Sequence, residues 1–165
     1  MKLCFYFLSL VLGLLLCACA SKASFTSSKA VFVVLNSPQI KFAEAGFLYQ
    51  KEANTKIEIY KLAQPFFVLD IQKNKICVNK YCTSKAKFNE QFFQNAHYDE
   101  LVSDIINAKA LYRGLNFKAQ ECGFEQNLTS KSDKFAIIYK VCNDEIAFED
   151  SKNKINFSLK RIESE

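Results

Sequence analysis

The segment KIEIYKLAQPFFVLDI, residues 56–71, decides the fold class because it has the pattern of two strands joined by a turn. Ile57 and Ile59 alternate with polar neighbours, which is typical of a strand with one buried face. Residues 61–65 contain a proline and predict a turn. The apolar run 66–71 then predicts a second, more deeply buried strand. We therefore expect a β-hairpin here.

Strand patterns continue on both sides of this hairpin. Before it, the apolar run 31–35 and two further extended segments precede the first strand of the hairpin. After it, residues 75–82 predict a short hairpin around Asn79-Lys80. Strand patterns resume near the C-terminus, at residues 122–125, 134–142, 145–148 and 154–162.

Two helices are expected between these groups of strands. In residues 84–93, Phe88 and Phe92 are four positions apart and share one helical face. Asp99 is placed to cap a second helix, and Gly114 closes the region. Strands, two helices and strands again predict an α+β fold that is mostly β. We expect an open, twisted antiparallel sheet, a half-barrel, with the helices covering its concave face.

The composition limits the function. The 165 residues are 50% hydrophobic and 24% charged, with a net charge of +5, which is the balance of a folded protein with one domain. Lys and Arg are scattered, so nucleic acid is not an expected partner. His97 is the only histidine, and we interpret it as a loop residue between the helices. No set of nucleophile, acid and base is evident, so we expect neither an enzyme nor a bound metal or cofactor.

The N-terminus has the pattern of an export signal. Lys2 precedes an apolar run that ends in small residues. Leu16-Cys17-Ala18-Cys19 resembles a bacterial lipobox, which predicts cleavage after residue 18 and lipidation of Cys19, palmitate included. An uncleaved membrane anchor is the alternative. We predict a lipoprotein signal peptide at 1–18, a lipidated N-terminus and flexible tether at 19–29, and one globular domain at 30–165.

Four cysteines remain after this segment, and an even number in an exported domain predicts two disulfides. Cys77 and Cys82 flank the two-residue turn and face each other across the predicted hairpin. Cys122 and Cys142 then form the second pair, although three connectivities are open. Zinc is the competing interpretation, and the spacing lacks the CxxC pattern that it favours.

The order of elements resembles the LolA and LolB family of lipoprotein carriers and receptors. The resemblance is carried by the hairpin 57–71, the helix pair between Thr83 and Ala110, and the closing hairpin around residues 150–153. It implies an open half-barrel with an apolar cavity beneath two helices. It also implies that Leu62, in the turn 61–65, contacts the membrane or a donor. The alternative is that Leu62 is an ordinary turn residue.

Sixteen phenylalanines in a chain without tryptophan raise the question of what they surround. We predict an apolar cavity that binds acyl chains by the area it removes from water, and a close-packed core is the alternative. The candidate lining residues are Ile57, Ile59, Val68, Leu69, Phe88 and Phe92. Asn127, in Glu125-Gln126-Asn127-Leu128-Thr129, is a candidate acceptor for N-glycosylation, with an unmodified surface loop as the alternative.

Together these patterns predict a LolB-like lipoprotein on the periplasmic face of the outer membrane. Such a protein binds lipoprotein acyl chains or another amphiphile and hands them over, without catalysis. Its expected partners are membrane lipid, through the acyl chains of Cys19, and other lipoproteins or a periplasmic carrier. The alternative is a non-catalytic scaffold or assembly lipoprotein whose sheet edge pairs with a protein partner.

Overall fold

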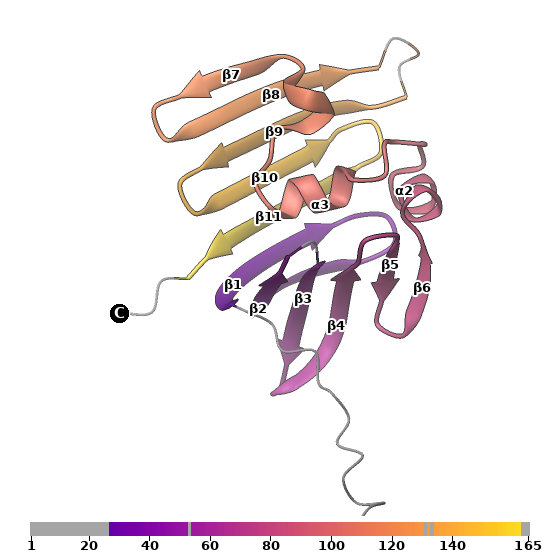
Figure 1. Cartoon of the computed structure of the whole chain (residues 1–165), viewed down its shortest axis with the longest axis vertical. Coiled ribbons are helices and arrows are strands. Elements are labelled where there is room, and N and C mark those ends of the chain that lie inside the picture. Colours follow the sequence, from indigo (N-terminus) through magenta and orange to yellow (C-terminus); the bar gives the residue numbers. More distant parts are fainter. Residues whose placement is uncertain (1–26, 53, 131, 133, 163–165) are drawn as a thin grey trace, which may run out of the picture.

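The computed structural model describes residues 27–52, 54–130, 132 and 134–162. Within these residues eleven strands form one antiparallel sheet in the order β6-β5-β4-β3-β2-β1-β11-β10-β9-β8-β7. The sheet is open, and two helices lie on its concave side (Figure 1). The predicted α+β half-barrel is therefore confirmed.

The first half of the sheet comprises β1 (Ser27–Asn36), β2 (Lys41–Lys51), β3 (Asn54–Lys61), β4 (Gln64–Ile71), β5 (Lys75–Val78) and β6 (Tyr81–Ser84). The second half comprises β7 (Phe117–Gln120), β8 (Gly123–Thr129), β9 (Ala136–Cys142), β10 (Glu145–Asp150) and β11 (Ile155–Arg161). Between them lie α2 (Lys85–Phe93), α3 (Leu101–Ile106) and the 3-10 helix η1 (Leu111–Gly114).

The strand order explains why the helices cover the sheet. β6 and β7 follow one another along the chain but occupy opposite edges of the sheet. Residues 85–116, which we call the strap, must therefore cross the full width of the sheet to connect them. Figure 1 shows the strap on one side of the sheet, with α2 beside the β5–β6 hairpin and α3 over the middle strands.

Alternating side chains place the core between the sheet and the strap. Val31, Val33 and Leu35 of β1 are buried and face the strap, whereas the residues between them face the convex side. β1 pairs with β11, so that Val33 lies opposite Leu159 and Leu35 opposite Phe157. The centre of the core is thus built from the first and last strands.

The two helices begin differently. The Ser84 side chain caps α2 by accepting a hydrogen bond from the Lys87 N–H, at 3.3 Å. Asp99 does not cap α3, contrary to the sequence prediction. The N-cap position is Glu100, whose carboxylate accepts hydrogen bonds from the buried Lys85 ammonium at 2.7 Å. This ion pair joins the start of α2 to the start of α3.

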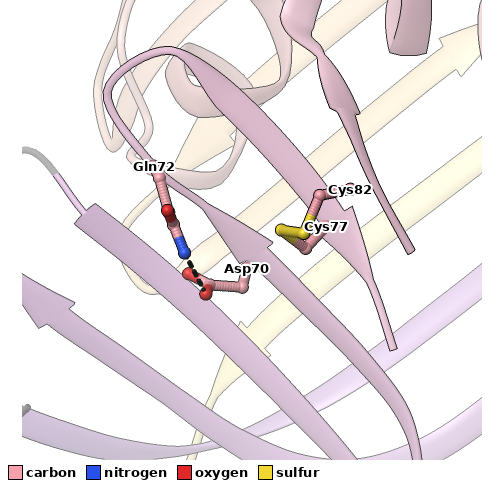
Figure 2. Close-up of a disulfide and its surroundings, with 4 residues drawn as sticks. All are labelled: Asp70, Gln72, Cys77 and Cys82. Atoms are coloured by element: carbon pink, nitrogen blue, oxygen red, sulfur yellow. Dashed lines mark hydrogen bonds between the residues drawn. A yellow bond between two sulfur atoms is a disulfide. The ribbon is translucent and has the colours of Figure 1, made fainter. Parts of the chain in front are cut away.

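Both predicted disulfides are present in the structure. Cys77 of β5 is bonded to Cys82 of β6, directly opposite it in the register. The bridge lies on the convex face, near Asp70 and Gln72, whose side chains are hydrogen-bonded at 2.7 Å (Figure 2). Cys122 is bonded to Cys142 at the end of β9. The bridges therefore fasten strands near the two opposite edges of the sheet.

The N-terminal predictions lie largely outside the described residues. This applies to the signal segment 1–18, to Cys19 and to the tether as far as residue 26. β1 begins at Ser27, which pairs with Gln50. Ser27, Ser28 and Lys29 are thus strand residues and not part of a tether, because backbone pairing with β2 extends the sheet to them. In the part of the chain that the structure describes, no helix has the length and apolar character needed to span a membrane.

Candidate binding cavity beneath the helices

An apolar cavity of about 70 Å³ lies between the concave face of the sheet and the strap. The sheet contributes lining residues from β1, β2, β3, β4, β10 and β11, among them Val33, Ile57, Leu69 and Ile155. The strap closes the opposite side with three phenylalanines of α2 and with branched side chains of α3. Those strap residues are Phe88, Phe92, Phe93, Val102, Ile105 and Ile106.

Five of the six predicted lining residues meet at this cavity. Ile57, Ile59 and Leu69 line it from the sheet, and Phe88 and Phe92 line it from α2. Val68 does not. Its Cα lies opposite Glu58, whereas Leu69 lies opposite Ile57. Since neighbouring residues of a strand face opposite sides, Val68 belongs to the convex face, and assigning both residues to the cavity was wrong.

The remaining lining residues were not predicted. Leu35 of β1 and Phe157 of β11 come from the two ends of the chain and meet because these strands pair. Their apolar alternation is visible in the sequence, but the pairing of the first strand with the last is not. Phe93 was also missed, because it directly follows Phe92 and does not share the four-residue spacing of Phe88 and Phe92.

The lining determines what the cavity can hold. Every side chain that lines it is apolar. A cavity without polar partners does not hold water well and favours apolar ligands. Its free space of about 70 Å³ exceeds the roughly 10–15 Å³ that a single water-sized group needs, so the cavity has room for a few such groups. The closed form can therefore accommodate only a short piece of hydrocarbon.

Hydrogen bonds hold the α3–η1 part of the strap on the sheet. The fully buried Gln126 of β8 accepts from the Leu111 N–H at 2.7 Å and donates to the carbonyls of Leu111 and Leu115 at 3.0 and 2.7 Å. Tyr139 of β9, also fully buried, donates to the Ile105 carbonyl at 3.2 Å. These contacts fix one end of the cavity cover.

A second contact ties the end of α3 to the other half of the sheet. The Asn107 side-chain oxygen Oδ1 accepts a hydrogen bond from the Gln50 side chain of β2 at 2.6 Å. Its amide group donates to the Ser103 carbonyl at 2.8 Å and to Thr55 of β3 at 3.2 Å. α3 is thus anchored to strands on both sides of the sheet centre.

His97 is a loop residue between the helices, as predicted, and its side chain is buried. Its ring is surrounded by Phe93, Tyr112 and Phe135. Nδ1 is hydrogen-bonded to the Tyr112 hydroxyl, and Nε2 has no hydrogen-bond partner in the described chain. Burial lowers the pKa of His97 from 6.5 to about 4, although the charge of Asp150 opposes this shift.

A second polar pair lies next to His97. The Tyr98 hydroxyl donates to the Asp104 carboxylate at 3.0 Å, and the ring of Tyr98 packs against that of Tyr112. Burial raises the pKa of Asp104 above its usual value, with the Tyr98 hydrogen bond acting in the opposite direction. All of these groups belong to the strap, residues 85–116. No group of three or more metal-ligating side chains occurs among the described residues.

The sequence matches no family model and none of the curated proteins with which it was compared. Its functional interpretation therefore depends on the geometry of the cavity and of the surfaces near it.

Leu62 occupies the tip of the two-residue turn between β3 and β4. It is 93% exposed, and both Leu62 and Ala63 have left-handed backbone conformations, with φ of 51° and 61°. Asn and Gly usually fill such positions, because a Cβ atom disfavours them. The turn thus presents a large apolar side chain to solvent at some cost in backbone energy.

Asn127 lies in strand β8. The surface loop that its sequence context predicted is not present at this position. Its side chain is on the exposed convex face and donates to the Glu125 carboxylate at 3.2 Å. Glu125 also forms an ion pair with Lys140 at 3.0 Å. The acceptor amide is therefore accessible but held in an extended strand.

Proposed function

We propose that this protein binds one hydrocarbon chain of an amphiphile between the concave face of the sheet and the strap, and hands it over without catalysis. The observation that carries this proposal is the cavity lined only by apolar side chains beneath α2 and α3. A close-packed core has no need of such a space, since voids reduce packing contacts. The cavity therefore favours a binding role over a purely structural one.

Physical chemistry accounts for both capture and release. Each methylene transferred from water to an apolar site contributes about 0.8 kcal/mol. A membrane offers the same gain, so a chain passes to the bilayer whenever its transfer into the bilayer is more favourable than its binding in the cavity. The small volume of the closed cavity supports release. A longer chain pushes the phenylalanine rings of α2 away from the sheet, so the protein loses packing between α2 and the sheet while the chain is bound. Handing over then needs no chemical step.

The predicted N-terminal processing supports a location in the cell envelope. In this proposal Cys19 carries the acyl chains that anchor the domain to the outer membrane, as in the LolB-like proteins that the element order resembles. The cargo is the acyl chain of another lipoprotein or of a similar amphiphile, delivered by a periplasmic carrier. Two disulfides support an oxidising compartment.

Val102→Phe tests the binding site directly. Val102 lines the cavity from α3, and a larger side chain there occupies the space that a ligand needs. We expect the fluorescent fatty acid cis-parinarate to bind the wild-type protein with micromolar affinity and the variant at least tenfold more weakly. Val34→Phe is the matched control, since Val34 follows Val33 in β1 and faces the convex side. Equal affinity of both variants, or no binding by the wild type, contradicts the proposal.

Leu62→Glu tests the delivery step. We expect transfer of bound cis-parinarate to phospholipid vesicles to slow about tenfold, because a carboxylate at the tip of the turn does not enter the bilayer. Equilibrium binding stays unchanged, and so does stability, within about 0.5 kcal/mol, since Leu62 is 93% exposed. Ile138→Glu, on an exposed position of β9, is the control for added charge. Slow transfer in both variants, or in neither, would show that Leu62 has no special role.

A scaffold function is the second candidate, and strand β7 favours it. All four of its residues are exposed, and Phe117 is 48% exposed. An exposed strand at a sheet edge can pair with an extended segment of a partner. If cis-parinarate does not bind, this edge becomes the preferred site, and a charged substitution at Phe117 should then abolish capture of the partner.

A further inference from the structure

A groove runs between α2 and the β5–β6 hairpin, outside the cavity described above. Its volume is about 290 Å³. Val78 of β5 and Tyr81 and Thr83 of β6 form one side, and Phe88 and Phe92 of α2 form the other. Tyr81 is 86% exposed and marks the outer end of the groove at the edge of the sheet.

Phe88 and Phe92 line both the groove and the cavity. Their rings are stacked, with centroids 5.5 Å apart, and both are half-buried. Phe92 also packs edge-on against Phe93, which lines the cavity but not the groove. Two aromatic rings on one helix are therefore the partition between the inner space and the outer one.

The two volumes complement each other. The groove is several times as large as the cavity, with volumes of about 290 Å³ and about 70 Å³. A chain of ordinary fatty-acid length is too long for the cavity alone. The cavity and the groove together have room for it, provided that the rings between them move aside.

The lining becomes more polar from the cavity to the groove. The cavity lining is entirely apolar, whereas Gln39, Thr83 and Gln91 border the groove. Neutral amide and hydroxyl groups can hydrogen-bond to an ester or a carboxylic acid without requiring a particular charge. This gradient orients an amphiphile with its tail inward and its head at the edge of the sheet.

The hydrogen bonds of the strap indicate which part moves. α3 and η1 are fastened to the sheet through Gln126, Tyr139 and Asn107. The side-chain hydrogen bonds of α2 run instead to the α3 side of the strap, from Lys85 to Glu100 and from Asn89 to the Tyr98 carbonyl. α2 therefore contacts the sheet through its phenylalanine rings, and moving the rings of Phe88 and Phe92 aside breaks apolar contacts only.

We infer that the hydrocarbon chain enters at the β6 edge of the sheet, through the groove between α2 and the β5–β6 hairpin, and passes Phe88 and Phe92 to reach the cavity. The head group stays at the outer end of the groove, beside Gln39 and Gln91. This inference rests on the proposed function and specifies its entrance and the orientation of its ligand.

Quenching of single tryptophans by brominated fatty acids tests the entrance. The chain has no tryptophan, so each substitution introduces a unique probe. Tyr81→Trp places the probe at the outer end of the groove, and Phe117→Trp places it on β7, at the opposite edge. We expect 2-bromopalmitate, which carries bromine next to its head group, to quench Trp fluorescence of the Tyr81→Trp protein by at least half at saturation. The Phe117→Trp protein should lose less than a tenth.

The outcomes separate the inference from the function on which it rests. If cis-parinarate binds but 2-bromopalmitate quenches only the Phe117→Trp protein, or both proteins equally, the entrance is not at β6 and the inference is overturned. If cis-parinarate does not bind the wild-type protein, the proposed function itself fails. Gln91→Trp, at an exposed groove position on α2, gives the same readout should Tyr81→Trp not fold.

Discussion

Replacing Gln126 with Met lowers the free energy of unfolding by about 3–5 kcal/mol. Gln126 is fully buried, and its amide satisfies the Leu111 N–H and the carbonyls of Leu111 and Leu115. Methionine has a similar shape but leaves these backbone groups without partners, and each unpaired buried group costs about 1–3 kcal/mol. Urea unfolding followed by circular dichroism measures the change.

The same substitution at Gln120 is the control for Gln126. Gln120 lies in β7, next to β8, and is exposed. Gln120→Met should change stability by no more than about 0.5 kcal/mol. If Gln126→Met is equally mild, the hydrogen bonds to the strap are not what holds η1 on the sheet.

Acidification from pH 7 to pH 4 destabilises the protein by about 3 kcal/mol through His97 alone. Burial lowers the pKa of His97 to about 4 in the folded state, compared with 6.5 in the unfolded chain. Between these values the unfolded state binds more protons. The contribution of His97 to stability is therefore fully present above pH 6.5 and is lost as the pH falls towards 4. Asp104, whose pKa burial raises, contributes in the opposite direction.

Two measurements isolate the histidine contribution. The free energy of unfolding of the wild type minus that of His97→Phe should fall by about 3 kcal/mol from pH 7 to pH 4, since phenylalanine does not titrate. Because His97 is the only histidine, its Hε1 resonance is the sole imidazole signal in an NMR titration. A midpoint near 6.5 in the folded protein would contradict the burial of this ring.

Local patterns in the sequence were sufficient for the fold class and for most of the cavity. Alternation in residues 56–60 placed Ile57 and Ile59 on the inner face, and helical spacing placed Phe88 and Phe92 opposite them. Val68 was misplaced because a continuous apolar run, unlike an alternating one, does not reveal which residues face inward. The structure resolves this through the register with β3.

Contacts between distant parts of the chain were beyond sequence reasoning. The role of Gln126 depends on a strap segment about fifteen residues away that crosses over β8. Its one signal is a polar residue on a face otherwise occupied by Phe124 and Leu128. The burial of His97 has no signal of this kind, because its aromatic neighbours come from α2, η1 and the segment before β9.

The pairing of β1 with β11 has a consequence for how the protein reaches its native state. The two strands lie side by side in the middle of the sheet but are separated by more than a hundred residues along the chain. Contacts of such high sequence separation slow folding, since a long loop must close before they contribute. A chain that emerges from its N-terminus onward therefore exposes an unpaired side of β1 until the last strand arrives. During that interval the unpaired side of β1 is prone to aggregation. A chaperone that binds this strand, or rapid synthesis of the rest of the chain, would limit that aggregation.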